Sequence, residues 1–270
     1  MKVSPAGLVL PLELEHIILQ MALENDMTDA KNLLFVAKYV FDWLIPILYR
    51  VVILSRSLNA YLPLHLPITK LPRYGRYVQH LFIESAPDEI IDQYLEFCPN
   101  VTDFAYWTTL TEPRINSVVR LPNLIQLGLN FHDILDIRFT PSALAAFSKI
   151  THVDAEALDV SFLSHFPSLT HLVLRFDHEP DMYNDVLERH PRLKVFILWE
   201  YGNFLFPKLE CNGIPGVNDA RVVHLKYGTM QNWKMNALGD PQNSWAFAER
   251  VVEERLAHTR AQKLADHEDA

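Results

Sequence analysis

Two octapeptides, PNLIQLGL at Pro122–Leu129 and PSLTHLVL at Pro167–Leu174, decide how this chain folds. Both have apolar residues at the third, sixth and eighth positions, and the last two alternate with a variable residue. This alternation is typical of a strand with one buried face. A proline suits the first position, because the backbone there need not donate a hydrogen bond to a neighbouring strand. Each octapeptide therefore predicts a short strand.

The pattern recurs seven times in 270 residues, with successive copies starting 19 to 29 residues apart. Helix-like segments separate the copies; one of them, residues 140–147, opens with a capping threonine and a proline. A single strand and its return helix cannot bury their apolar surface alone, so such units stack on one another. The seven copies are RYVQHLFI (Arg76–Ile83), PNVTDFAY (Pro99–Tyr106), PNLIQLGL (Pro122–Leu129), SKITHVDA (Ser148–Ala155), PSLTHLVL (Pro167–Leu174), PRLKVFIL (Pro191–Leu198) and ARVVHLKY (Ala220–Tyr227).

This rhythm predicts an α/β fold in which residues 76–232 form an irregular leucine-rich-repeat-like solenoid of parallel strands. The asparagine that builds a ladder inside standard repeats is missing, so an irregular arc is expected. The alternative is a conventional α/β domain whose strands share a starting motif.

The flanking segments differ from the repeats. Residues 8–54 contain two apolar helical runs that Pro46 should end, followed by a strand that leads into the sheet. Three prolines in residues 55–75 predict an irregular connection. In residues 233–257, an amphipathic helix is expected to cap the open end of the solenoid, with Trp245, Ala248, Val252 and Leu256 on one face. Residues 258–270 are polar and predict a flexible tail.

The N-terminal motifs resemble a known family. LPLE at Leu10–Glu13, LLFVAK at Leu33–Lys38, Trp43 and PILYR at Pro46–Arg50 are similar to the F-box-like domain of fungal, mushroom-type proteins. The stretch from Trp233 to Glu249 is similar to the C-terminal signature of F-box/leucine-rich proteins of that type. The chain departs from the family at Ala37, where Ser or Cys is usual, in the helix that the family uses for docking.

The resemblance implies a non-enzymatic receptor that bridges a Skp-family adaptor of a cullin–RING ubiquitin ligase to an unidentified client protein. Apolar side chains would enter a groove of the adaptor. The alternatives are that these side chains only pack within the module, and that the chain is a stand-alone repeat scaffold without a ligase. The predicted adaptor-binding residues are Leu10, Pro11, Leu12, Ile17, Ile18, Leu34, Val36 and Trp43.

A client surface is expected on the strand side chains that point away from the predicted core. Aromatic and aliphatic residues recur there, as they do at protein interfaces. The alternative is that a loop or the C-terminal segment covers this face. The predicted client-binding residues are Phe82, Trp107, His152, His171, Val173, Arg175, Ile197 and Trp199.

Composition argues against most other functions. Lys plus Arg total 24 against 33 Asp plus Glu, a net charge of −9 that disfavours nucleic acid. The 8 glycines form no phosphate-binding or nucleophile-elbow motif, so neither an enzyme nor a cofactor is expected. No stretch reaches the ~20 apolar residues of a membrane span. The two cysteines are typical of a cytoplasmic or nuclear protein.

Four histidines, His80, His152, His171 and His224, occupy the same place in their copies. His152 and His171 should lie on adjacent strands, about 5 Å apart. The other two would lie several strands away, so a four-ligand metal site is not expected and surface histidines are the preferred interpretation.

Overall fold

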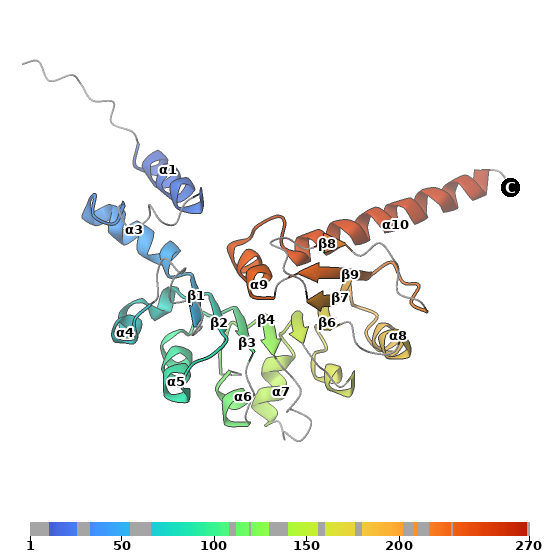
Figure 1. Ribbon diagram of the computed structural model, residues 1–270, viewed down its shortest axis with the longest axis horizontal. Helices are drawn as coiled ribbons and strands as arrows, with labels where there is room; N and C mark the ends of the chain where they lie inside the picture. The colour runs from blue at the N-terminus through green and yellow to red at the C-terminus, as the bar shows by residue number, and fades with distance from the viewer. Residues whose placement is uncertain are drawn as a thin grey trace, which may run out of the picture.

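A computed structural model describes residues 11–25, 33–54, 66–107, 112–118, 120–129, 140–155, 160–175, 180–201, 208–209, 216–227 and 229–268. In these residues the chain is an α/β protein built on one sheet, whose strands run in the order β1-β2-β3-β4-β5-β6-β7-β9-β8 (Figure 1). All neighbours pair in parallel except β8 with β9. The strands are β1 (Val51–Leu54), β2 (His80–Ile83), β3 (Asp103–Tyr106), β4 (Gln126–Leu129), β5 (His152–Ala155), β6 (His171–Arg175), β7 (Val195–Tyr201), β8 (Lys208–Leu209) and β9 (Val222–Tyr227).

Each of the seven octapeptides ends in a strand, as predicted. The fifth residues of six successive copies lie side by side from β2 to β7, for example His152 beside His171 and His171 beside Val195. β1 joins the same register, because Val51 lies beside His80. Ile47–Leu54 is thus a further copy, which sequence reasoning recognised only as a strand.

The starts of β2 to β7 follow one hydrogen-bonding rule. The carbonyl of the fourth residue in a copy accepts the N–H groups of the fourth and fifth residues of the next. Thr151 O, for example, accepts from Thr170 N at 2.9 Å and from His171 N at 3.0 Å. Two asparagine side chains also form hydrogen bonds between neighbouring copies, although no asparagine ladder was expected. Asn100 Nδ2 donates to Arg76 O at 2.7 Å, and Asn123 Nδ2 donates to Pro99 O at 3.4 Å.

The seventh copy does not follow the predicted register. His224 was aligned with Val195, but it lies beside Leu198, three residues further along β7. Because the side-chain period of a strand is two, an odd shift reverses the faces of β9. Contacts of Arg221, the residue before β9, hold the first residues of this strand in place. Its side chain binds Asp219 through Nε and Nη2, and Nη1 donates to Leu193 O at 3.2 Å.

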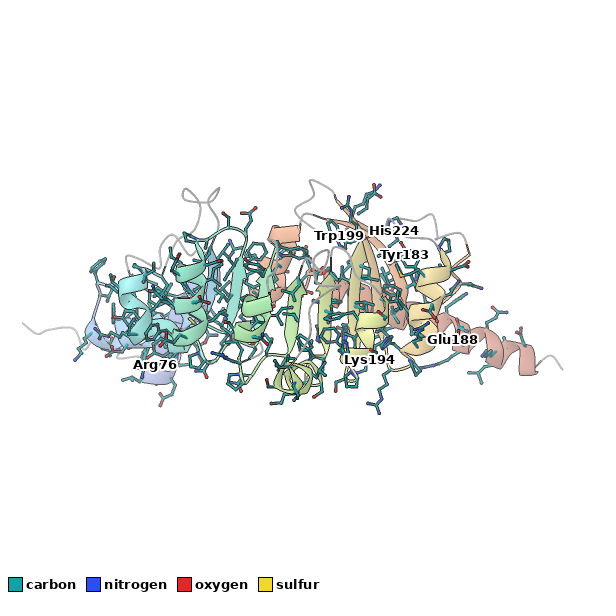
Figure 2. The ribbon with its side chains drawn as sticks, turned by 90° about the horizontal axis from the view of Figure 1, so that it is seen from below. Arg76, Tyr183, Glu188, Lys194, Trp199 and His224 are labelled. Atoms are coloured by element: carbon teal, nitrogen blue, oxygen red, sulfur yellow. The ribbon has the colours of Figure 1, made fainter. Side chains whose placement is uncertain are left out.

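Helices cover both faces of the sheet. The main core lies between one face of the sheet and the helices α5 to α8, which Figure 2 views from below. The helices α9 and α10 lie over the opposite face, hereafter the outer face (Figure 1). The helix bounds on the first face are α5 (Asp88–Phe97), α6 (Glu112–Val118), α7 (Pro141–Phe147), η3 (Val160–His165) and α8 (Pro180–Arg189); on the outer face they are α9 (Thr229–Leu238) and α10 (Ser244–Glu268).

At the N-terminal end, α1 (Leu12–Asn25) packs on α3 (Lys38–Leu48), and α3 leads into β1. The expectation that Pro46 ends the helix is wrong. Pro46 lies in the last turn of α3, and the helix continues to Leu48 because only one intrahelical donor is lost there. Of the predicted irregular connection, residues 55–65 lie outside the described residues. The rest forms the helical turns η1 (Ile68–Lys70), α4 (Leu71–Tyr74) and η2 (Gly75–Tyr77).

At the C-terminal end, two expectations need correction. α10 does not cap the end of the sheet: Ala248 and Val252 pack on the outer face, against strands β6, β7 and β9. The predicted tail at 258–270 is helical as far as Glu268, because α10 continues beyond the sheet. None of the described helices combines the length and the apolar composition of a bilayer span.

We predict that Gly75→Ala destabilises the fold. A Cβ at Gly75 would lie 2.3 Å from Phe97 O, a backbone atom that cannot turn aside. Overpacking of this kind costs about 1–3 kcal/mol. Denaturant unfolding should show a lower midpoint for this variant, while Lys70→Ala, an exposed change in the neighbouring turn, should not shift it. An unchanged midpoint for Gly75→Ala would contradict this close approach.

Candidate functional site

An exposed apolar surface follows one side of α1. Leu14, Ile17, Ile18 and Met21 are 46–56% exposed and recur at helical spacing, and Leu12 at the start of the helix is 60% exposed. We call Leu14, Ile17, Ile18 and Met21 the α1 stripe. Single exposed apolar residues are ordinary, but an apolar stripe on one helix face marks an interaction surface.

The opposite side of α1 holds the helix on α3. Leu19 packs against the small core of Val40, Leu44 and Leu48. His16 stacks on Trp43 with ring centroids 5.0 Å apart. The side of α1 opposite the stripe is therefore already packed on α3. The stripe itself faces solvent.

A second contact secures the same side. Tyr39 meets Trp43 edge to face at 5.1 Å, and its hydroxyl donates to Glu15 Oε2 at 3.3 Å. α1 therefore rests on α3 through an aromatic and polar contact rather than through a large apolar core.

The predicted adaptor-binding residues fall into two groups. Pro11, Leu12, Ile17, Ile18 and Val36 are exposed, Val36 by 67%. Leu34 and Trp43 are partly buried in contacts inside the module, as the alternative interpretation expected, and Leu10 lies outside the described residues.

Sequence reasoning missed three exposed residues, namely Leu14, Met21 and Phe35. Phe35 is 88% exposed, next to Val36. The helical spacing of Leu14 and Met21 with Ile17 was visible in the sequence and could have identified both. Nothing local to Phe35 distinguishes it from a core residue.

The outer face of the sheet is not the open surface that was expected. Trp233 of α9 packs on Phe82 with ring centroids 5.2 Å apart, and its Nε1 donates to the buried Asp103 at 3.2 Å. α10 covers the other end, where Trp199 is 5% exposed. The expectation of free side chains is therefore wrong for Phe82, His171, Val173, Ile197 and Trp199, which are buried; Trp107 and His152 are partly buried, and Arg175 is exposed.

The reason is physical. The outward residues of these strands are apolar, and α9 and α10 supply apolar faces that remove them from water. The alternative in which the C-terminal segment covers this face matches the burial. Asn232 and Ser244 join the two helices by a reciprocal pair of hydrogen bonds, 2.8 and 2.9 Å long, with both residues buried.

The most polar part of the outer face is a histidine pair on β5 and β6. His152 and His171 stack with centroids 4.1 Å apart and an interplanar angle of 5°. Trp245 of α10 meets both rings edge to face, at 5.3 and 5.6 Å. The predicted proximity of the two histidines is confirmed, but α10 screens them from solvent.

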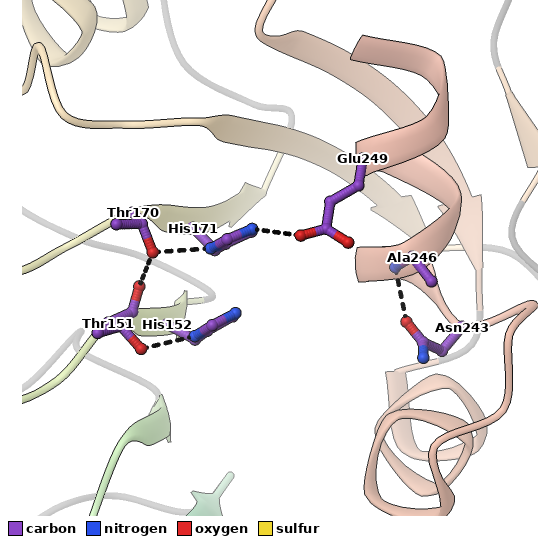
Figure 3. A network of polar contacts seen from close by, with 7 residues as sticks. All are labelled: Thr151, His152, Thr170, His171, Asn243, Ala246 and Glu249. Carbon is purple, nitrogen blue, oxygen red and sulfur yellow. Dashed lines mark hydrogen bonds and ion pairs between the residues drawn. The ribbon is translucent and has the colours of Figure 1, made fainter. Parts of the chain in front are cut away.

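Figure 3 shows how the ring of His171 is held. Its Nε2 lies 3.0 Å from Glu249 Oε1, and its Nδ1 lies 2.8 Å from Thr170 Oγ1. A carboxylate only accepts, so a neutral His171 carries its proton on Nε2 and its Nδ1 is an acceptor. Thr170 Oγ1 has one proton, which it can donate either to His171 Nδ1 or to Thr151 O, 3.2 Å away, but not to both. His171 thereby links β6 to α10.

Burial keeps both histidines neutral. Desolvation and the neighbouring His171 lower the pKa of His152 to about 3. Desolvation, followed by the Lys194 ammonium, lowers the pKa of His171 to about 4. The Glu249 carboxylate acts in the opposite direction on the pKa of His152, but desolvation outweighs it, because the Glu249 side chain is 51% exposed and its charge is screened by water.

The contact between a threonine hydroxyl and a histidine ring recurs in two successive repeats. Thr151 and His152 repeat the arrangement of Thr170 and His171, with the same 2.8 Å distance, although among the described residues no carboxylate forms a hydrogen bond with His152. The repeat thus produces the same hydroxyl–imidazole contact on both strands. Within the described chain, no group of three or more His, Cys, Asp or Glu side chains could hold a metal ion.

In comparisons with known proteins, no family model, no curated protein and no solved structure matches this chain. The resemblance to F-box-like proteins rests on the sequence motifs quoted above.

We predict that the histidine pair makes stability depend on pH. The folded pKa values, about 3 and about 4, lie below the ordinary value of 6.5, so the unfolded chain binds more protons below pH 6.5. The free energy of unfolding should therefore fall as the pH falls from 6.5 towards 4, by up to about 1.4 kcal/mol per pH unit for each histidine.

Denaturant unfolding at several pH values measures this slope. The double variant His152→Gln/His171→Gln should flatten it, whereas His258→Gln, a change at an exposed position of α10, should leave it unaltered. An equally steep slope in the double variant would mean that other groups cause the acid sensitivity.

Proposed function

We propose that this protein is a non-enzymatic bridging receptor of F-box type. Its N-terminal module would bind a Skp-family adaptor of a cullin–RING ubiquitin ligase, and its repeats would hold a client protein. The α1 stripe is the observation that carries the proposal, because four large apolar side chains on one face of the helix are each at least 46% exposed.

A helix that presents such a stripe binds by laying it in an apolar groove. The stripe suits this mode because its residues follow helical spacing and because α3 holds the opposite side of α1. Phe35 and Val36 add two further exposed apolar side chains in the same module. Truncating a central anchor of such an interface costs more than about 1 kcal/mol of binding free energy.

We further propose that the sheet and its helices form a leucine-rich-repeat-like solenoid. The proposal is supported by the shared register of β1 to β7, by the carbonyl that accepts two N–H groups at the starts of β2 to β7, and by the asparagine hydrogen bonds between copies. Such a receptor would work in the cytoplasm or nucleus, in keeping with the free, buried Cys98.

The second candidate is a stand-alone repeat scaffold with no ligase. The packing of Leu34 and Trp43 inside the module favours it, because part of the predicted docking surface already has a partner within the chain. The two functions differ in whether the adaptor is captured.

We predict that Ile17→Asp/Ile18→Asp abolishes adaptor binding. Two carboxylates in the middle of the stripe would be buried without partners in an apolar groove, at a cost of several kcal/mol. Affinity capture of a purified Skp-family adaptor, followed by titration calorimetry, should show at least a tenfold loss. Both residues are more than half exposed, so the melting temperature should not change.

Leu264→Asp is the matched control, since Leu264 is 67% exposed on α10, at the other end of the molecule (Figure 1). This variant should bind the adaptor like the wild type. If the wild type captures no adaptor, the scaffold function takes precedence; if the double variant binds normally, the stripe is not the docking surface.

A further inference from the structure

The edge of the sheet at which the parallel strands begin carries an excess of positive charge. The first four residues of the copies that end in β2 to β7 include Arg76, Lys149, Arg192 and Lys194 but no Asp or Glu, although the whole chain has a net charge of −9. Arg76 and Lys194 both lie along the lower edge of the sheet in Figure 2, whereas Trp199, near the end of β7, lies at the upper edge. An uneven charge distribution of this kind attracts anionic partners to the basic side of the molecule.

Three of these cations lie close together at the starts of β5 and β7. Lys149 is the second residue of its copy, and Arg192 and Lys194 are the second and fourth residues two copies further along. Neighbouring strands are about 4.8 Å apart, so these two copies begin about 10 Å apart. All three side chains are exposed, and none forms an ion pair within the described chain. We call Lys149, Arg192 and Lys194 the basic edge.

Two carboxylates on neighbouring helices leave the basic edge unpaired. Glu249 of α10 lies 3.0 Å from His171 Nε2, and Glu188 is exposed near the end of α8. Among the described residues, neither carboxylate forms an ion pair with the basic edge. The three cations are therefore available to a partner of opposite charge.

An exposed aliphatic side chain, Ile125, lies on the same edge. It is 45% exposed and is the fourth residue of its copy. Its carbonyl accepts Thr151 N at 2.9 Å, and Thr151 O accepts Thr170 N at 2.9 Å. Thr170 O in turn accepts Lys194 N at 2.8 Å. Ile125 and Lys194 are thus the two ends of a row that crosses four strands and is about 14 Å long, which an extended segment covers in about four residues.

We propose that this edge binds an acidic protein segment in which an aliphatic residue lies within about four residues of a cluster of Asp or Glu. The aliphatic side chain would contact Ile125, and the carboxylates would pair with the basic edge. Arg192 can bind a carboxylate through two parallel hydrogen bonds. Nucleic acid is disfavoured, because the first four residues of the copies that end in β4 to β7 include no aromatic side chain on which a base could stack.

The inference deepens the proposed function, because it moves the client from the outer face, which α9 and α10 cover, to the edge where the strands begin. It rests on the proposed function only for the identity of the segment as the client's; binding itself needs no adaptor. The backbone groups of the row from Ile125 to Lys194 are already paired between strands, so recognition falls to the side chains.

The probe is a labelled, capped peptide, ALSEDEA, titrated with the full chain by fluorescence anisotropy at low salt. Lys149→Glu/Lys194→Glu should weaken binding about tenfold, because two attractions at exposed sites become repulsions. The same variant should bind the basic peptide ALSKRKA more tightly than the wild type does. Added salt should weaken the binding of ALSEDEA. Both lysines are exposed, so the melting temperature should not change.

Arg260→Glu/Lys263→Glu is the matched control. It changes the net charge by the same amount, at two exposed positions of α10 beyond the sheet (Figure 1). This variant should bind ALSEDEA like the wild type.

A second variant, Ile125→Ser, tests the aliphatic contact without a change of charge. It should bind ALSEDEA several-fold more weakly than the wild type does. It should bind ASSEDEA, the peptide without the leucine, as the wild type does.

Equal binding of ALSEDEA by the wild type and Lys149→Glu/Lys194→Glu overturns the proposal, as does a dissociation constant above about 1 mM. Tighter binding of a single strand of ten thymidines than of ALSEDEA would also overturn it, in favour of nucleic acid. Adaptor capture is a separate readout, since Lys149→Glu/Lys194→Glu leaves the α1 stripe intact. A chain that binds the peptide without capturing the adaptor retains this binding edge and loses only the ligase connection.

Discussion

At both ends the sheet of this protein is apolar on both faces, and this constraint shapes the rest of the molecule. In β7, Phe196 and Leu198 face the helices of the repeats, while Val195, Ile197 and Trp199 face the opposite way. Neither face can remain in water without a large loss of stability. Parallel strands resolve this by placing helices on both sides, and here the return helices cover one face and the C-terminal helices the other.

The C-terminal helices thus complete a core that the repeats leave open. α9 seals β1 to β3 through Trp233, which joins an apolar contact with Phe82 to a hydrogen bond with Asp103. α10 packs on β6, β7 and β9. The ring contact between His171 and Trp245 lies between this apolar packing and the polar centre of the outer face. Because α9 and α10 cover it, the outer face is less accessible to a partner than expected. The helical side of the sheet and the N-terminal module are more accessible.

The N-terminal module carries more apolar surface than its own core can bury. Its core is small, because α1 and α3 meet through a few residues such as Leu19 and Leu44, and much of the apolar surface of α1 stays outside. A unit of about 40 residues buries too little to hide every apolar side chain it carries. A partner that covers the α1 stripe would supply the missing apolar contact, and this is the physical basis of the proposed bridging function.

The apolar pattern of the chain predicts the seven strands, their parallel order and the faces of six of them, since this pattern is local and its period of two specifies which side chains turn inward. The α1 stripe is also visible in the pattern, in the spacing of Leu14, Ile17 and Met21. The register of β9 follows instead from contacts distant in the sequence, because those of Arg221 with Asp219 and Leu193 O join residues up to 28 positions apart. The position of α10 over the sheet also could not be predicted. The outward side chains of the strands have the same sequence pattern whether water or a second layer of helices covers them.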